Sequence, residues 1–261
     1  MAKTIMITGA GSGLGKGTAL GLANEGHKVI AAVENHPQIT SLKEAAQDAG
    51  VSLEIFKMDI TNPKDRERMK RYDYDVFVAN AAVNEGGPIW EVPMSALREL
   101  FEVNVFSTLE TARIAAEHFV EKEQGKIVFM SSMAGSMASA YKGLYASSKH
   151  AIEAIAKSLK QEMEEFNVQV ATINPGPFDT GFNDRAVEEK WEWFNEDKHH
   201  TSVEKLKNSE KGLENQLDPQ LMIDKMVEII PMDHHKFRTA YPEDTAENMR
   251  KEEKKNWEIE I

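Results

Sequence analysis

The sequence predicts one α/β domain of three layers, in which helices cover both faces of a doubly wound parallel β-sheet. Three observations predict it. Short β-rich runs alternate with helix-like stretches, several of these runs are apolar without strict alternation, and a glycine-rich turn joins the first run to the first helix. Alternating strands and helices are typical of right-handed βαβ units. Uninterrupted apolar strands are expected where helices bury both faces of a sheet.

The first half of the chain supplies four expected strands and the helices between them. The strands are predicted over residues 3–8, 28–33, 52–58 and 75–79. The helices are predicted over residues 13–25 and 38–49. Gly26 and Gly50 follow these helices directly, as C′ glycines do. A short helix is expected after Pro63, because proline is favoured at the first helical position.

The second half continues the same alternation and brings the sheet to about six or seven strands. Its strands are predicted over residues 126–131, 168–174 and 237–240. Its helices are predicted over residues 94–119, 145–166 and 219–230. No internal repeat and no Pro/Gly/Ser-rich linker divides the chain. Residues 1–261 are therefore expected to form a single domain.

Two segments interrupt the alternation. Residues 180–217 are polar and charged but carry Trp191, Trp193 and Phe194, which suggests a helical insertion over the edge of the sheet. This aromatic cluster fits either the core of a lid or the wall of a substrate pocket. Residues 244–261 form a charged tail, for which the simplest interpretation is a solvated or frayed end.

Composition excludes several classes of function. The chain has 261 residues, 41% of them hydrophobic, which is enough for a sizeable core. Its net charge of −12 argues against a nucleic-acid partner, because neutralising phosphates requires cationic surface. The chain has no cysteine, so disulfides, thiolate zinc sites and thiol catalysis are excluded. Neither a targeting segment nor an apolar stretch of membrane-spanning length is evident, so a cytoplasmic protein without a membrane partner is expected.

The glycine-rich turn predicts a dinucleotide site. Gly9, Gly13 and Gly15 are spaced as T-G-x-x-x-G-x-G, which matches neither the G-x-G-x-x-G pattern nor a P-loop. Glycines allow the backbone to approach a pyrophosphate, and the following helix offers free N–H groups and the positive end of its dipole. The alternative is a plain glycine-rich strand-to-helix turn. The strand–turn–helix context favours the cofactor site of a Rossmann-type fold.

The end of the second strand bears on the choice between NAD and NADP. Glu34 lies about 20 residues beyond the glycine turn, where an acid accepts hydrogen bonds from a free ribose. No Arg or Lys adjoins it to accommodate a 2′-phosphate. NAD is therefore favoured over NADP. If the register places Val33 at the decisive position instead, Glu34 would point into solvent.

Four further polar residues suggest acid–base chemistry. Tyr145 and Lys149 begin a predicted helix with i, i+4 spacing, which puts them on one face. A nearby cation favours the phenolate and so suits a phenol for proton transfer. Ser132 follows the fifth strand, at the sheet edge where ligands bind. Asn104 lies inside a predicted helix, although asparagine has a modest helix propensity. It is therefore either a buried amide whose hydrogen bonds are satisfied within the core or a functional group.

Taken together, these motifs resemble the short-chain dehydrogenase/reductase family, in its compact single-domain branch. The resemblance covers residues 3–180 most strongly and residues 219–240 more loosely. Its marks occur in the expected order: residues 8–15, Asp59, residues 79–82, Asn104, Ser132, Tyr145-x-x-x-Lys149 and residues 175–180.

The resemblance implies an oxidoreductase that interconverts a ketone and a secondary alcohol with NAD or NADP. In this family pattern, Tyr145 is the acid/base and Lys149 lowers its pKa and holds the nicotinamide ribose. Ser132 binds the substrate oxygen, and Asn104 holds a water in a proton relay. A homo-oligomer, either a tetramer or a dimer, is also implied, with pairing through the helices expected at 94–119 and 145–166.

The resemblance also implies a set of cofactor contacts. Asp59 would hold the adenine, Asn80 the region beside the cofactor, and Thr180 the nicotinamide carboxamide. The full set is Gly9, Ser12, Gly13, Leu14, Gly15, Glu34, Asp59, Ile60, Asn80, Ala81, Tyr145, Lys149, Pro175, Gly176, Phe178 and Thr180. Two residues depart from the family pattern: Ala82 replaces a glycine and narrows the space beside the cofactor, and Ala79 lacks an amide that could hydrogen-bond.

Two alternatives to an oxidoreductase are a metal site and a dinucleotide-binding protein without catalytic activity. A metal site is disfavoured, because the adjacent pairs His199–His200 and His234–His235 do not share a helix face and suit surface positions. A catalytically idle dinucleotide-binding sensor or scaffold is the alternative from another functional class, since fold alone does not establish function. The complete set of Asn104, Ser132, Tyr145 and Lys149 favours the enzyme.

Overall fold

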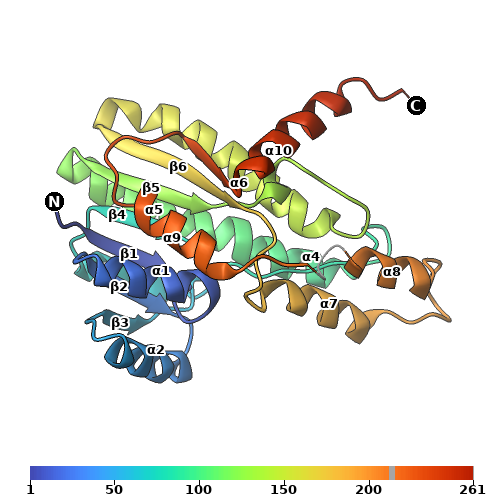
Figure 1. Cartoon of the computed structure of the whole chain (residues 1–261), viewed down its shortest axis with the longest axis horizontal. Coiled ribbons are helices and arrows are strands. Elements are labelled where there is room, and N and C mark those ends of the chain that lie inside the picture. The colour runs from blue at the N-terminus through green and yellow to red at the C-terminus, as the bar shows by residue number, and fades with distance from the viewer. Residues whose placement is uncertain (212–214, 261) are drawn as a thin grey trace.

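The computed structural model describes residues 1–211 and 215–260. At its centre lies a seven-stranded parallel sheet in the order β3-β2-β1-β4-β5-β6-β7 (Figure 1). The strands are β1 (Thr4–Thr8), β2 (Lys28–Val33), β3 (Glu54–Lys57), β4 (Val76–Ala79), β5 (Gly125–Met130), β6 (Val168–Pro175) and β7 (Arg238–Tyr241). The doubly wound parallel sheet predicted from the sequence is confirmed. Its order reverses between β1 and β4, and such switch points create ligand crevices at the carboxyl ends of strands.

Helices cover both faces of the sheet. The α-helices of the described residues are α1 (Gly13–Asn24), α2 (His36–Asp48), α3 (Pro63–Arg66), α4 (Met94–Phe101), α5 (Thr108–Lys122), α6 (Gly143–Glu162), α7 (Phe182–Trp193), α8 (Val203–Glu210), α9 (Pro219–Ile229) and α10 (Glu243–Asn256). One core joins α1, α2 and α9 to one face, which includes Ile5 and Ile7 of β1. A second core joins α5 and α6 to the other face, which includes Met6. Successive β1 side chains thus enter opposite cores, as the pleat requires.

The helix expected over residues 94–119 is not continuous. It divides into α4 and α5, joined by a π-helical segment, Glu102–Ser107. Where this segment meets α5, the Thr108 hydroxyl donates to the carbonyl of Val103 at 3.0 Å. The Asn104 side chain is drawn to the backbone after β4, which anchors the segment. Such π-helical turns inside α-helices are frequent at functional sites.

The C-terminal tail also differs from the expectation of a solvated or frayed end. Its described part forms α10, and Thr245 and Met249 on that helix are buried. The far end fits the expectation better, because Trp257 is 88% exposed. Figure 1 shows this end projecting away from the body of the molecule. Residue 261 of the expected tail lies outside the described residues.

The insertion at residues 180–217 contains α7 and α8, which lie beyond the carboxyl ends of the strands (Figure 1). Residues 212–214 of this expected lid lie outside the described residues. The aromatic cluster packs on itself, with ring centroids of Trp191 and Phe194 5.7 Å apart. Trp193 packs against a small core of Val92, Leu100 and Leu144. The cluster therefore forms part of the core beneath the insertion.

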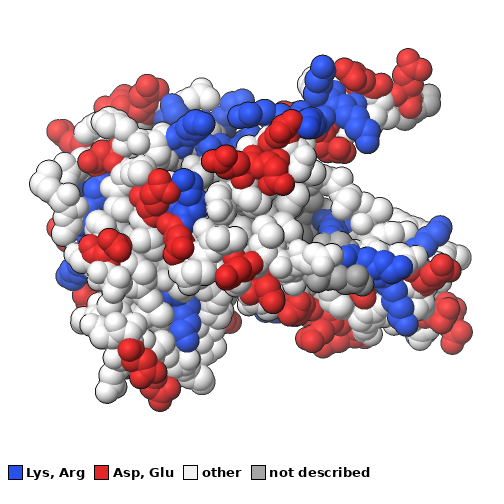
Figure 2. Space-filling view, in the orientation of Figure 1, with Lys and Arg blue, Asp and Glu red and all other residues white. Residues whose placement is uncertain are grey.

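The surface mixes both signs of charge. On the face drawn in Figure 2, acidic and basic side chains are interspersed, and α10 carries many of both. None of the helices in residues 1–211 and 215–260 combines the length and apolarity needed to cross a membrane.

Candidate active site

A cleft of about 790 Å³ opens at the carboxyl ends of the strands. Its walls come from the glycine turn after β1 and from the loops that follow β2 to β6, together with α6 and the first residues of α7. The cleft therefore spans the point where the strand order reverses, as in other open α/β sheets that bind ligands.

The glycine turn is shaped by close backbone approach. Gly9 has φ +65° and Gly13 φ +51°, a region that favours glycine. A Cβ on Gly15 would lie 2.4 Å from Asn80 Nδ2 and 2.5 Å from the Gly9 carbonyl oxygen. The Thr8 hydroxyl accepts hydrogen bonds from the main-chain N–H groups of Asn80 and Ala81, each at 3.0 Å. The turn is thereby held against the loop after β4, and side chains larger than glycine do not fit.

The first turn of α1 faces the cleft with its donors free of side-chain caps. Ser12, the N-cap residue, makes no side-chain capping bond, and the first turn has no acidic residue. Free N–H groups and the positive end of the helix dipole suit an anion such as a pyrophosphate. The glycine cradle, the uncapped helix start and the length of the cleft fit a dinucleotide.

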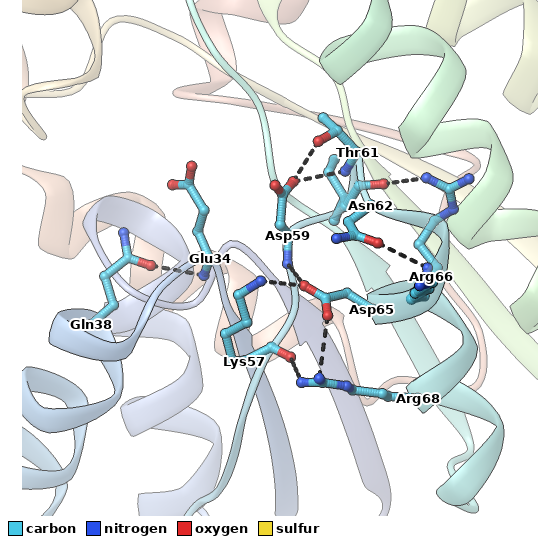
Figure 3. A network of polar contacts seen from close by, with 11 residues as sticks. Glu34, Gln38, Lys57, Asp59, Thr61, Asn62, Asp65, Arg66 and Arg68 are labelled. Carbon is cyan, nitrogen blue, oxygen red and sulfur yellow. Dashed lines mark hydrogen bonds and ion pairs between the residues drawn. The ribbon is translucent and has the colours of Figure 1, made fainter.

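One end of the cleft carries two acidic residues. Glu34 lines the cleft, whereas Val33 is fully buried in the core, so Glu34 occupies the position at the end of β2 that faces a ligand. The main-chain N–H of Glu34 donates to Gln38 Oε1 at 2.9 Å. Figure 3 shows the carboxylates of Glu34 and Asp59 extending to the same side of their loops. Asp59 Oδ1 accepts from the N–H and hydroxyl of Thr61, at 2.9 and 2.7 Å.

Hydrogen bonds and ion pairs centred on Asp65 and Arg66 fix the loop that carries Asp59 (Figure 3). Asp65 is only 4% exposed, accepts hydrogen bonds from the main-chain N–H of Asp59 at 3.1 Å and from Lys57, and forms an ion pair with Arg68. Burial raises the pKa of Asp65, but the Lys57 and Asp59 hydrogen bonds outweigh it and hold that pKa below its ordinary value. Arg66 donates to the Ile60 carbonyl at 2.7 Å. Asp59 is thus presented on a rigid loop.

At the other end of the cleft, Tyr145 near the start of α6 faces Ser132, which follows β5. Ser132 Oγ accepts from the Ala134 N–H at 3.1 Å and so caps a short 3₁₀ turn. Burial raises the pKa of Tyr145 above its usual range, and a hydrogen bond with Ser132 opposes this effect only in part. This net direction is opposite to the lowering expected from a neighbouring cation. Tyr145 is accordingly a protonated phenol at neutral pH.

Lys149 lies one helical turn beyond Tyr145. Its ammonium is 5.6 Å from the centre of the Tyr145 ring and donates to the Met130 carbonyl at 2.8 Å. The side chain lines the cleft although the residue is only 3% exposed. Burial lowers the pKa of Lys149 to about 8, and the charge of Glu153 acts in the opposite direction.

Asn104 does not line the cleft. It is 1% exposed, its Oδ1 accepts from the Val83 N–H at 2.8 Å, and its Nδ2 donates to the Val83 carbonyl at 2.9 Å and to Ser148 Oγ at 3.1 Å. Both amide hydrogens are therefore engaged. The side chain ties the π-helical segment and α6 to the loop after β4, one layer behind the cleft.

The loop after β6 closes the cleft on the lid side. Phe182 packs edge-on against Tyr145, with ring centroids 5.7 Å apart. Thr180 lies over the glycine turn, because a Cβ on Gly13 would approach the Thr180 Cβ to 3.5 Å. Of the predicted catalytic and cofactor-binding residues, all but Asn104 line this one cleft: Gly9, Ser12, Gly13, Leu14, Gly15, Glu34, Asp59, Ile60, Asn80, Ala81, Ser132, Tyr145, Lys149, Pro175, Gly176, Phe178 and Thr180.

Sequence reasoning missed other residues of the cleft. Gln38, Glu99, Glu102, Asn183 and Arg185 line it. They lie on helices at ordinary surface spacing, and no local motif distinguishes them. Among the residues that the structure describes, no group of three or more His, Asp or Glu is placed to hold a metal ion.

Comparisons with known proteins show the family and the fold of the chain. The family model described as short chain dehydrogenase matches residues 3–191. A diacetyl reductase [(S)-acetoin forming] of Staphylococcus epidermidis is 32% identical over 196 residues, which cover 72% of this chain and 76% of that protein. A 3-ketodihydrosphingosine reductase of Bacteroides thetaiotaomicron is 28% identical over 236 residues, 90% of this chain and 86% of that protein.

Solved structures show the same fold. A short-chain dehydrogenase from Streptomyces avermitilis superposes with a TM-score of 0.82 at 23% identity, over 99% of this chain and 94% of that one. A short chain dehydrogenase/reductase from Burkholderia phymatum in complex with NAD superposes with a TM-score of 0.80 at 20% identity, over 95% and 92%. The chain belongs to the short-chain dehydrogenase family of oxidoreductases, whose members bind NAD or NADP.

Proposed function

We propose that the protein interconverts a ketone and a secondary alcohol, with NAD or NADP as hydride carrier and Tyr145 as acid/base. The observation that carries this proposal is the placement of Ser132, Tyr145 and Lys149 at one end of the cleft that begins at the glycine turn. A phenol, a hydroxyl and an ammonium suit proton transfer to a carbonyl oxygen and stabilisation of its developing charge.

In the proposed reaction, the bound nicotinamide supplies or accepts the hydride. Ser132 donates a hydrogen bond to the substrate oxygen and orients it toward the phenol. In reduction, Tyr145 gives its proton to that oxygen as negative charge develops there. Lys149 stabilises the phenolate that remains, because an adjacent cation favours the charged form. Phe182, which packs against Tyr145, covers the phenol on the lid side and limits its access to water.

The protonation state of the phenol determines how the rate of each direction should depend on pH. The raised pKa of Tyr145 keeps the proton on the phenol, ready for donation. Lys149 carries its charge below a pKa of about 8. Oxidation of an alcohol needs the phenolate instead and should therefore gain from a higher pH.

Asn104 supports the site from behind. Its amide hydrogens are donated to Val83 and Ser148. A relay water would therefore donate its hydrogen bond to the second lone pair of Asn104 Oδ1 or to the main-chain carbonyl of Asn104. The hydrogen bonds to Val83 add a second task, which is to hold the loop that adjoins the cofactor.

NAD is the proposed cofactor. The Glu34 carboxylate at the end of β2 would accept hydrogen bonds from the adenosine ribose and repel a 2′-phosphate. Asp59, on its braced loop, would hold the adenine, and the N-terminus of α1 would hold the pyrophosphate. The Burkholderia phymatum structure was determined with NAD, whereas a similar Sphingobium yanoikuyae short-chain dehydrogenase, with a TM-score of 0.72 and 20% identity over 98% of this chain and 96% of that one, was determined with NADPH.

The names of the relatives support a carbonyl or alcohol substrate of no single type. They include a reductase for diacetyl and one for 3-ketodihydrosphingosine. The decisive experiment is a panel of ketones and secondary alcohols, followed by nicotinamide absorbance with each cofactor. Turnover of at least one member would support the enzyme. Tight dinucleotide binding without turnover across the panel would favour the idle sensor or scaffold instead.

We further propose a cytoplasmic homo-oligomer, a tetramer or a dimer, with residues 180–217 acting as a substrate lid in a single domain. Exposed apolar side chains on the helices expected to pair support the assembly: Met94 is 54% and Phe106 55% exposed. Burying them against a second copy would remove apolar surface from water. Light scattering that returns the monomer mass of 29.3 kDa would refute the assembly.

A further inference from the structure

Glu153 is a buried carboxylate for which the proposed chemistry has no use. It lies on α6 one turn beyond Lys149 and two turns beyond Tyr145, so the three share a helix face. The residue is 7% exposed. Burying an ionised carboxylate is costly unless hydrogen bonds and opposite charge compensate it. Its partners therefore determine how it can act on the two site residues of the same helix.

Those partners come from the last two strands. Asn174 of β6 donates to Glu153 Oε1 at 2.5 Å. Arg238 of β7 donates to Oε2 through Nε at 3.1 Å and through Nη2 at 2.5 Å. Two arginine nitrogens thus converge on one carboxylate oxygen and Asn174 holds the other, so both oxygens of Glu153 are fixed in place. β7 is in this way tied to the helix that carries Tyr145 and Lys149.

The same cluster reaches the serine. Asn174 is fully buried and also donates to the main-chain carbonyl of Ser132 at 2.9 Å. The turn after Ser132 rests on Glu153, because a Cβ on Gly135 would lie 2.9 Å from Glu153 Cγ. Glu153 therefore supports the turn that Ser132 caps, both by contact and through Asn174.

Glu153 also acts on the ammonium. Its charge opposes the lowering of the Lys149 pKa that burial causes. Of the ionisable groups near Lys149, Tyr145 and Glu153 lie on α6, and Arg238 of β7 is paired with Glu153. Glu99 and Glu102 line the same cleft. The turn at residues 133–135 and strand β6 contain no ionisable side chain.

We propose that Glu153 is a positioning residue that places a negative charge one helical turn from the Lys149 ammonium and holds Ser132 in line with the phenol, with Arg238 fixing its carboxylate. The inference rests on the proposed function, because it takes from there the roles of Lys149 and Ser132. Glu153 itself does not contact the cleft. Loss of its charge should therefore change the pKa of Lys149, whereas loss of its shape should change the position of Ser132.

The direct test is the pKa of Lys149, measured by NMR of ¹³C- and ¹⁵N-labelled lysine in the cofactor-free protein, with Lys149→Arg to assign the signal. Glu153→Gln removes the charge and should lower the Lys149 pKa by about one pH unit. Glu153→Asp keeps the charge and should leave the pKa within a few tenths of the wild-type value. Glu162→Gln, an exposed glutamate at the end of the same helix, is the matched control.

Turnover provides the second readout. In Glu153→Gln, the alkaline limb of kcat for reduction should move to lower pH by the same amount, and kcat at pH 8 should fall about fivefold. Glu153→Asp should lose rate through misplacement of Ser132 while keeping the position of that limb. A purely structural role predicts equal loss in both variants with no movement of the limb.

An unchanged Lys149 pKa in Glu153→Gln, or an equal change in Glu162→Gln, would overturn the inference. If Glu153→Gln does not fold, the double variant Glu153→Met/Arg238→Met decides, because it replaces the buried ion pair with apolar side chains of similar volume. The Lys149 pKa should fall in this variant, and an unchanged pKa contradicts the account. If no ketone is turned over by the wild type, the proposed function fails, whereas the NMR titration still tests the inference by itself.

Discussion

The ammonium of Lys149 lies 5.6 Å from the centre of the Tyr145 ring, one turn along the same helix. The two groups are held by different means: Lys149 by a hydrogen bond to Met130, and Tyr145 by packing against Phe182. Burial pushes both toward their neutral forms, since it raises the pKa of the phenol and lowers that of the ammonium. The pair therefore rests as a phenol beside a cation that is close to losing its proton.

The first prediction concerns pH. Lys149 is a cation with a depressed pKa of about 8, so its charge is present below that pH and lost above it. Reduction should therefore decline as pH rises through about 8. Lys149→Arg keeps a cation at all accessible pH values, so whatever activity it retains should decline only at higher pH. The measurement is kcat against pH for both proteins; coincident profiles would contradict the assignment.

The second prediction concerns Ser132. Ser132→Ala removes the proposed hydrogen bond to the developing oxyanion and should lower kcat by roughly 10²–10³-fold, with little change in cofactor affinity. Ser41→Ala, at an exposed position on α2, is the matched control. Steady-state kinetics and a cofactor titration decide the outcome. A loss of cofactor affinity without a loss of kcat would contradict the role of Ser132 as a hydrogen-bond donor to the substrate oxygen.

The third prediction concerns cofactor choice. Glu34→Arg replaces a carboxylate that repels a 2′-phosphate with a group that binds it, and should improve NADP affinity relative to NAD by about tenfold or more. Glu44→Arg makes the same charge change at an exposed position of α2. Dissociation constants from tryptophan fluorescence measure the ratio. Equal effects of the two substitutions would show only a general charge effect.

The fourth prediction concerns Asn104. Asn104→Ala leaves the buried Val83 N–H and carbonyl without their partner and should lower the free energy of unfolding by about 1–3 kcal/mol. Urea unfolding compares it with Asn208→Ala at an exposed position of α8. Unchanged stability would mean that the Val83 loop does not depend on this amide.

The strands, the glycine turn and most of the site could be predicted because their signals are local. Buried parallel strands are apolar runs, and Gly9 and Gly13 adopt positive φ that glycine favours. The strand ends also converge by topology alone. Residues as distant as Glu34 and Thr180 therefore fall in one cleft once the sheet order is known.

The rest depends on contacts between distant segments. The π-helical segment follows from the pairing of Asn104 with Val83 across a loop. The ion pair of Glu153 and Arg238 joins residues 85 positions apart. Helix α10 is charged enough to suggest a solvated tail, but it buries Thr245 and Met249. Neither periodicity nor propensity contains this information, because tertiary contacts override both.

The most direct test of the account is Tyr145→Phe, which removes the transferable proton and keeps the ring against Phe182. Turnover on the substrate found by the ketone panel should fall by at least ~10²–10⁴-fold, while NAD binds with near wild-type affinity. A Tyr145→Phe protein that retains near-normal turnover would contradict the central claim that this phenol is the acid/base.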